Sequence, residues 1–184
     1  TPQIYLTQAE IDYFKPFYQL DKPILAIQPN GGPANLGYNY SWTRDIPEPT
    51  VNAVVEEFKD QYSIVHIKRD DQKKYPNTFH ALDNFRSIAI LLQLSTKRLL
   101  IDSFTQHLSA AYHLPSTVCW VTTKPECFGY EMHDNILANK FTLPIDFPNN
   151  LYQPFNLAQD IVSCPYKNLN EVFDVDKIIN SIKK

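Results

Sequence analysis

The sequence predicts an α/β fold, a three-layer sandwich with a mainly parallel, Rossmann-like sheet. Two observations support this prediction. Short apolar runs, typical of strands that are covered on both faces, alternate along the chain with segments of helical spacing. Several of the helical segments carry an apolar stripe that suits packing against a sheet. A chain that alternates strands and helices in this way builds a parallel sheet between layers of helices.

The elements follow one another through a single domain. We expect a lead-in helix or linker over residues 1–22, a Rossmann-like domain over 23–140, and an irregular wrap with a C-terminal helix of the same domain over 141–184. Thr7 and Glu10 form the capping-box pattern of the lead-in helix, and Asp83 is expected to cap a later one. The expected strands are 23–28, 62–67, 99–101 and 117–121, and the expected helices after the lead-in are 50–59, 85–94, 104–112 and one capped by Asp174. Residues 127–139 are expected to be a loop with a short strand.

Composition limits the classes of function. Of the 184 residues, 43% are hydrophobic and 20% are charged, as in an ordinary globular domain. The net charge of −3 gives no basic footprint, so we expect no nucleic-acid partner. No apolar run has the length of a membrane span, and no signal peptide is recognisable. The three cysteines are widely spaced and form neither a metal motif nor a disulfide framework, which favours free thiols in the cytoplasm.

The stretch from 97 to 123 is the centre of the predicted site. It is expected to run strand, helix, strand, and Asp102 and Ser103 come directly after the first strand. In an open parallel sheet, ligands bind at the carboxyl ends of the strands, where helix N-termini direct donors at anions. Asp102, Ser103 and His107 therefore lie where such a fold keeps its chemistry. The alternative is that Asp102 and Ser103 only cap the helix.

A glycine-rich loop follows the strand at 23–28. Three of the four glycines, Gly31, Gly32 and Gly37, lie in it, which suggests that the backbone approaches a phosphate closely. The alternative is a hairpin turn at Asn30-Gly31. Neither a GxGxxG nor a Walker motif is present, so the sequence has no dehydrogenase or P-loop signature.

Arg44 follows this loop and precedes the helix at 50–59. A guanidinium at this place is suited to charge-assisted hydrogen bonds with a diphosphate. The alternative is an exposed arginine before a helix. His66 lies inside a predicted strand and is expected to be a packed histidine.

Asp102, Ser103 and His107 form the motif Asp-Ser-x-x-x-His-Leu, which is followed by two alanines and by a Leu-Pro before a strand. This pattern resembles a motif of the heptosyltransferase-type glycosyltransferases (glycosyltransferase family nine, GT-B architecture). That family carries Asp-(Ser/Thr)-Gly-x-x-His here, and Phe104 takes the place of its glycine. A second match, over 44–48, resembles the family pattern of a basic residue, any residue, then Trp-Pro-Glu, with isoleucine in place of tryptophan. The resemblance covers most of residues 1–140.

The resemblance implies a C-terminal, donor-binding half of GT-B architecture that binds a nucleotide-activated sugar. Family members transfer the sugar with inversion to a glycan, often a cell-envelope polysaccharide. By this resemblance the diphosphate-binding residues are Gly31, Gly32, Arg44, Asp102, Ser103 and His107, and Asp83 lies near the nucleoside. No metal or other cofactor is implied. The location is cytoplasmic, either free or peripheral at the inner face of the membrane.

The resemblance also implies a partner. An N-terminal, acceptor-binding domain of the same protein would supply the general base, so this half alone should turn over nothing. Two other functions compete with this interpretation. The first is a catalytically inactive nucleotide or sugar-nucleotide binding module, which the phenylalanine at 104 would suit. The second is a hydrolase with Ser103 or Cys119 as nucleophile, but no Gly-x-Ser-x-Gly elbow surrounds Ser103.

Overall fold

The computed structural model describes residues 3–31, 41–140 and 164–184. Within them, six strands form one parallel sheet in the order β3-β2-β1-β4-β5-β6. The strands are β1 (Ile24–Ile27), β2 (Ser63–His66), β3 (Phe79–His80), β4 (Lys97–Ile101), β5 (Thr117–Trp120) and β6 (Asp134–Leu137). The predicted fold class, an α/β sandwich with a parallel sheet, is confirmed.

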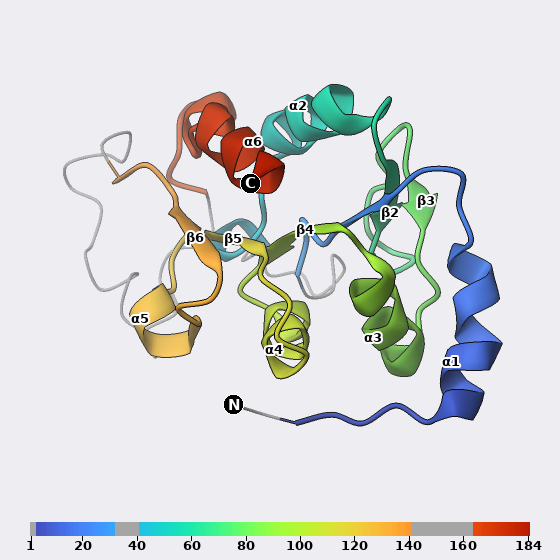
Figure 1. Cartoon of the computed structure of the whole chain (residues 1–184). Helices are drawn as coiled ribbons and strands as arrows, with labels where there is room; N and C mark the ends of the chain where they lie inside the picture. The colour runs from blue at the N-terminus through green and yellow to red at the C-terminus, as the bar shows by residue number, and fades with distance from the viewer. Residues whose placement is uncertain (1–2, 32–40, 141–163) are drawn as a thin grey trace.

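Helices cover both faces of this sheet (Figure 1). Helices α2 and α6 lie on one face, and α3 and α4 lie on the other, with α1 beside α3. In the described ranges the helices are α1 (Gln8–Phe14), α2 (Glu48–Phe58), α3 (Phe85–Leu94), α4 (Phe104–Ala111), α5 (Pro125–Phe128) and α6 (Val175–Lys183), and the 3-10 turns are η1 (Lys15–Tyr18), η2 (Ser41–Thr43) and η5 (Leu169–Glu171). None of the helices in these ranges is long and apolar enough to cross a membrane.

The central strands are buried on both faces, as their continuous apolar runs predict. Along β1 and β4 successive side chains alternate between the two cores. Leu25 and Ile101 join the core under α2 and α6, whereas Ala26 and Leu100 join the core under α3 and α4. Two packed cores therefore fix the sheet between its helix layers.

Most expected elements are present, with one corrected cap and two missed elements. The capping box of Thr7 and Glu10 opens α1 as predicted. The predicted cap at Asp83 is wrong, because the side chain of Asn84 accepts hydrogen bonds from the amides of Arg86 and Ser87 at 2.9 and 3.1 Å. Strand β3 and helix α5 were not expected, and the short strand expected within 127–139 is β6.

The strand order reverses between β1 and β4. From β1 the chain moves outward through β2 and β3, and then crosses back to β4, β5 and β6. The hairpin alternative for Asn30-Gly31 is wrong, because β1 pairs in parallel with β2, which follows α2. The carboxyl ends of β1 and β4 therefore flank a topological switch point, where open α/β sheets bind their ligands.

Candidate functional site

The candidate site lies at this switch point, where Gln28 joins the two strands. Gln28 directly follows β1 and is 6% exposed. Its amide nitrogen donates to the Ser103 hydroxyl at 3.2 Å, and the Thr105 hydroxyl donates to its amide oxygen. Both partners belong to the beginning of α4, which follows β4. These bonds hold the N-terminus of α4 against the end of β1.

Ser103 does not cap its own helix. It is the N-cap residue of α4, but its side chain makes no capping hydrogen bond. The hydroxyl accepts from Gln28, and none of the described residues accepts its proton. The first amides of a helix have no partner within the helix and carry the positive end of its dipole. The alternative that Ser103 only caps a helix is therefore wrong, and its hydroxyl is available to an anion beside the first amides of α4.

Asp45 holds the glycine loop on the other side of the switch point. Its carboxylate accepts from the Gly31 amide at 2.8 Å and from the Asn30 side chain at 3.0 Å. Burial raises the pKa of Asp45 to about 6, although these hydrogen bonds and Arg44 act to lower it. A β-carbon on Gly31 would lie 3.1 Å from the Ile101 side chain, so the loop approaches the end of β4 closely. A side chain at this position would require the end of Ile101 to shift by a few tenths of an ångström.

Arg44 lies beside this loop. Its guanidinium carbon would be 3.8 Å from a β-carbon on Gly31, and the residue is exposed. The preceding residue, Thr43, is anchored to the end of β5, since its carbonyl accepts from the Thr122 amide and hydroxyl at 3.1 and 3.0 Å. The structure thus brings Arg44 and Gly31 together at the crevice. Gly32 and Gly37 lie outside the described residues.

Asp102 and His107 face the β5 side of the site. The Thr123 hydroxyl donates to Asp102 at 2.6 Å, which ties the ends of β4 and β5 together. The His107 ring pairs with the Tyr130 hydroxyl at 3.0 Å and meets the Tyr130 ring edge-on. Ser103 faces Gln28 instead. The motif is therefore divided, with Ser103 toward β1 and with Asp102 and His107 bonded to residues that follow β5.

A pocket of about 260 Å³ opens between the carboxyl ends of β1, β2 and β4. Asp83 lines it together with Ser103 and Phe104, so the structure brings the predicted nucleoside contact and the predicted phosphate contact into one cavity. The remaining lining residues are Gln28, Asn30, Ile67, Lys68, Arg69, Gln72 and Ile88. Cations, amides, a hydroxyl and a carboxylate thus line a polar pocket at the switch point.

Sequence reasoning missed Gln28, Thr105 and Asp45. Gln28 carries a readable signal, because it is a polar residue at the carboxyl end of an apolar strand. Asp45 lies inside the segment that resembles the family, next to Arg44, but nothing in that pattern assigns it a partner. Thr105 is buried inside α4 and gives no signal.

The hydrolase alternative finds no support at this site. Ser103 is paired with the amide of Gln28, which cannot take up a proton as a general base. Cys119 is fully buried, and burial raises the pKa of its thiol. The other two cysteines are also free. The described ranges contain no group of three or more histidine, cysteine or acidic side chains placed to hold a metal ion.

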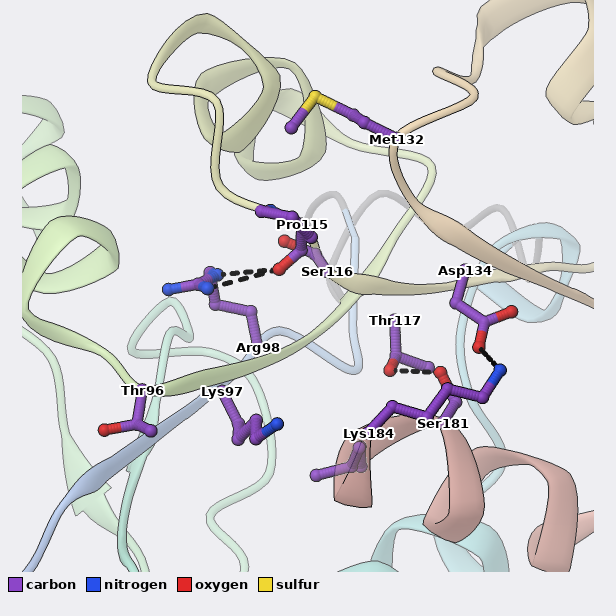
Figure 2. A pocket seen from close by; sticks show the side chains of 11 residues that line it. Thr96, Lys97, Arg98, Pro115, Ser116, Thr117, Met132, Asp134, Ser181 and Lys184 are labelled. Carbon is purple, nitrogen blue, oxygen red and sulfur yellow. Dashed lines mark hydrogen bonds and ion pairs between the residues drawn. The ribbon is translucent and has the colours of Figure 1, made fainter.

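A second pocket, of about 350 Å³, lies at the opposite, amino edge of the sheet (Figure 2). Most of its polar side chains have hydrogen-bond or ion-pair partners within the protein. Arg98 donates to the carbonyl of Pro115, Thr117 and Ser181 share a hydrogen bond of 2.6 Å, and Lys184 donates to Asp134 at 2.6 Å. Although this pocket is larger than the crevice pocket, most of the polar side chains that line it already bond to other protein groups.

The fold and the crevice define a class: a Rossmann-like α/β domain with a polar, anion-suited site at its switch point. Several solved structures share this fold. A family 9 glycosyl transferase from Veillonella parvula DSM 2008 matches with a TM-score of 0.63 and 14% identity over 98% of this chain and 52% of that one. The E. coli ADP-heptose lps heptosyltransferase II matches with a TM-score of 0.55 and 15% identity, over 73% of this chain and 45% of that one.

The heptosyltransferase TibC, solved in complex with ADP-D-β-D-heptose, matches with a TM-score of 0.56 and 14% identity. The match covers 89% of this chain and 45% of the TibC chain. This chain thus spans about half the length of its structural neighbours. The resemblance to heptosyltransferase-type enzymes is confirmed at the level of the fold. No protein-family model and no curated protein matches the sequence.

Proposed function

We propose that this chain is the donor-binding half of an inverting glycosyltransferase that takes a nucleotide-activated sugar and serves a glycan acceptor such as a cell-envelope polysaccharide. The observation that carries the proposal is the Ser103 hydroxyl, which is directed away from its own helix toward the switch-point crevice. The fold shared with glycosyltransferases supports it, and the ADP-heptose bound to TibC supports the class of donor.

The donor diphosphate would lie between the N-terminus of α4 and the glycine loop. Ser103 would donate its hydroxyl proton, and the first amides of α4 would add donors and the positive helix dipole. Gly31 would allow a close approach, and Arg44 would offset the negative charge. Negative charge grows on the diphosphate as the sugar departs, so these preorganised groups would stabilise the leaving group.

The remaining predicted residues would have supporting roles. The hydrogen bond between Thr123 and Asp102 fixes the turn that carries Ser103. His107, paired with Tyr130, would steady α4 rather than contact the phosphates. The acceptor and its general base would belong to a second domain, because the structural neighbours are about twice as long as this chain. Arg44 supplies the cationic charge, so the proposal requires no metal ion.

A catalytically inactive binding module is the second candidate, and Phe104 favours it. The family carries glycine at this place, and a side chain there alters the approach to the phosphates. Both candidates predict the same nucleotide binding. They differ in sugar transfer once an acceptor-binding half is supplied.

Calorimetric titration of the purified chain with ADP, GDP, UDP and CDP, with and without magnesium, tests the proposal. We expect one nucleotide to bind, and Ser103→Ala and Arg44→Ala to lose most of its affinity. Ser181→Ala and Lys97→Ala, at the amino edge, are matched controls that should bind as wild type does. Absence of binding at millimolar nucleotide, or binding that survives both crevice substitutions, would contradict the proposal.

A further inference from the structure

Two exposed phenylalanines stand side by side at the rim of the crevice pocket. Phe85 begins α3 and Phe104 begins α4, and their ring centroids are 5.8 Å apart. The side chains are 49% and 39% exposed. Phe104 lines the pocket directly, as do Asp83 and Ile88 on either side of Phe85 in the sequence.

This pair is not explained by packing in the core. The rings are 34° from parallel, an arrangement that gives only a partial stack between them. Exposed aromatic surface next to a polar pocket is typical of a surface that takes a flat ligand group. Aromatic side chains bind nucleobases of any sequence in this way, because every base presents a flat π-face.

The polar surroundings indicate where the rest of a nucleotide would lie. Ser103 and the first amides of α4 stand next to Phe104 in sequence, so a phosphate at these donors places the attached nucleoside within the same pocket. Lys68 and Arg69 line the pocket from the end of β2 and add positive charge. Asp83 presents a carboxylate, which accepts hydrogen bonds from exocyclic amino groups.

We propose that Phe85 and Phe104 form an aromatic ledge that stacks the base of a purine nucleoside diphosphate, with Asp83 accepting a hydrogen bond from the amino group of the base. The inference rests on the proposed function and specifies its substrate class. A purine offers a larger face to two adjacent rings than a pyrimidine does, and adenine and guanine both carry an amino group.

The position of Phe104 distinguishes this role from closure of the phosphate site. A β-carbon on Gly31 would face Ile101, which belongs to the core under α2 and α6. Phe85 and Phe104 begin the two helices on the opposite face of the sheet. The ring of Phe104 thus packs beside Phe85 of α3, whereas the glycine loop lies near Ile101 of the other core.

Affinity measurements with ADP and with inorganic pyrophosphate separate stacking from phosphate binding. Phe104→Ala should weaken ADP binding about 5- to 100-fold and leave pyrophosphate binding unchanged. Phe85→Ala should act in the same direction and more weakly. Phe17→Ala removes an equally exposed ring on η1 and should alter neither ligand. All three side chains are exposed, so these variants should fold.

Phe104→Gly introduces the glycine that the family carries at this position. The ledge and closure of the phosphate site predict opposite changes in ligand affinity for this variant. The ledge predicts weaker ADP binding, whereas tighter binding of both ligands would overturn it in favour of closure. Equal weakening of ADP and pyrophosphate by Phe104→Ala, unchanged ADP binding in that variant, or tighter binding of UDP than of ADP and GDP would also overturn it. If wild type binds neither ADP nor pyrophosphate, the proposed function itself fails; if ADP binds and Phe104→Ala retains it, only the ledge fails.

Discussion

The two edges of the sheet both carry a polar pocket, but they use their polar groups differently. At the amino edge, Arg98 donates to the carbonyls of Leu92 and Ser95 at the end of α3, at 3.0 and 2.5 Å, and also to Pro115. It thus stabilises the C-terminus of α3, where a cation complements the helix dipole. At the carboxyl edge, Ser103 leaves its helix uncapped and Arg44 is exposed.

This difference shows that pocket volume is a poor guide to function in this molecule. The larger pocket is lined mostly by side chains that bond to other protein groups, whereas the smaller one includes the Ser103 hydroxyl, whose proton none of the described residues accepts. A ligand gains most from preorganised donors that need not first break protein contacts. The two edges should therefore respond in opposite ways to substitution.

The largest effect is expected from Arg98→Met. The two buried carbonyls of Leu92 and Ser95 would lose this donor, and an unsatisfied buried acceptor costs roughly 1–3 kcal/mol, so the free energy of unfolding should fall by about 2 kcal/mol or more. Urea denaturation measures this loss. Nucleotide affinity of the folded fraction should not change. A variant as stable as wild type would show that the amino edge is not a structural site.

Arg44→Ala should show the reverse pattern. We expect ADP affinity to fall about 10- to 100-fold, since hydrogen bonds to charged groups contribute roughly 1.5–3 kcal/mol. Stability should change by less than about 0.5 kcal/mol, because the side chain is exposed. Calorimetry and urea denaturation on the same sample measure both quantities. If Arg44→Ala lost stability but kept its ADP affinity, Arg44 would have a structural role like that of Arg98, and the two edges would not differ in function.

Stability should fall on acidification because of His66, at the carboxyl end of β2. The residue is fully buried, and neither ring nitrogen has a hydrogen-bond partner among the described residues. Burial lowers the pKa of His66 to about 3, with smaller contributions from Lys68 and His80. The unfolded chain therefore binds a proton near its ordinary value of 6.5 and the folded chain does not. The loss should approach about 1.4 kcal/mol per pH unit below 6.5 and end near pH 3.

Asp45 should oppose this trend. Its raised pKa of about 6 means that the folded state binds a proton more tightly than the unfolded state, so it adds stability as the pH falls from 6 toward 3.8. His66→Leu should flatten the measured loss, and Asp45→Asn should steepen it. Urea denaturation at a series of pH values tests both. The same slope in His66→Leu as in wild type would assign the acid sensitivity to other groups.

The smallest effect is expected from Lys184→Ala. This exposed side chain pairs with Asp134 at the amino edge, and exposed ion pairs contribute about 0–1 kcal/mol. Melting temperature should fall slightly and ADP affinity should stay at the wild-type value. Loss of ADP affinity in Lys184→Ala would indicate that the ligand binds at the amino edge and not in the switch-point crevice.

The fold could be predicted because its signals are local. The apolar runs of β1, β4 and β5 and the stripes of α2, α3 and α6 each lie within a few consecutive residues. Strand β3 and helix α5 have two and four residues, too few to show a period. The cap of α3 was misplaced by one residue because Asp83 and Asn84 are both good caps, and only the structure decides between them.

The candidate site could be located but not assembled from the sequence. Local spacing placed Ser103 at a strand end, but its partner Gln28 lies 75 residues away. Asp45 was missed because its role depends on contact with Gly31 in another loop. His107 was predicted from the family motif, but its partner Tyr130 could not be, because Tyr130 comes after β5 in the chain. Contacts across a sheet depend on strand order, which periodicity does not encode.

The most direct test is to map ADP onto the chain by NMR chemical-shift perturbation in a ¹⁵N-labelled sample. We predict the largest amide shifts at Gly31, Ser103 and Phe104, at the carboxyl edge. The amides of Thr117 and Ser181, at the amino edge, should stay in place. Shifts concentrated on Thr117 and Ser181, or no shifts at saturating ADP, would contradict the assignment of the ligand site to the switch-point crevice.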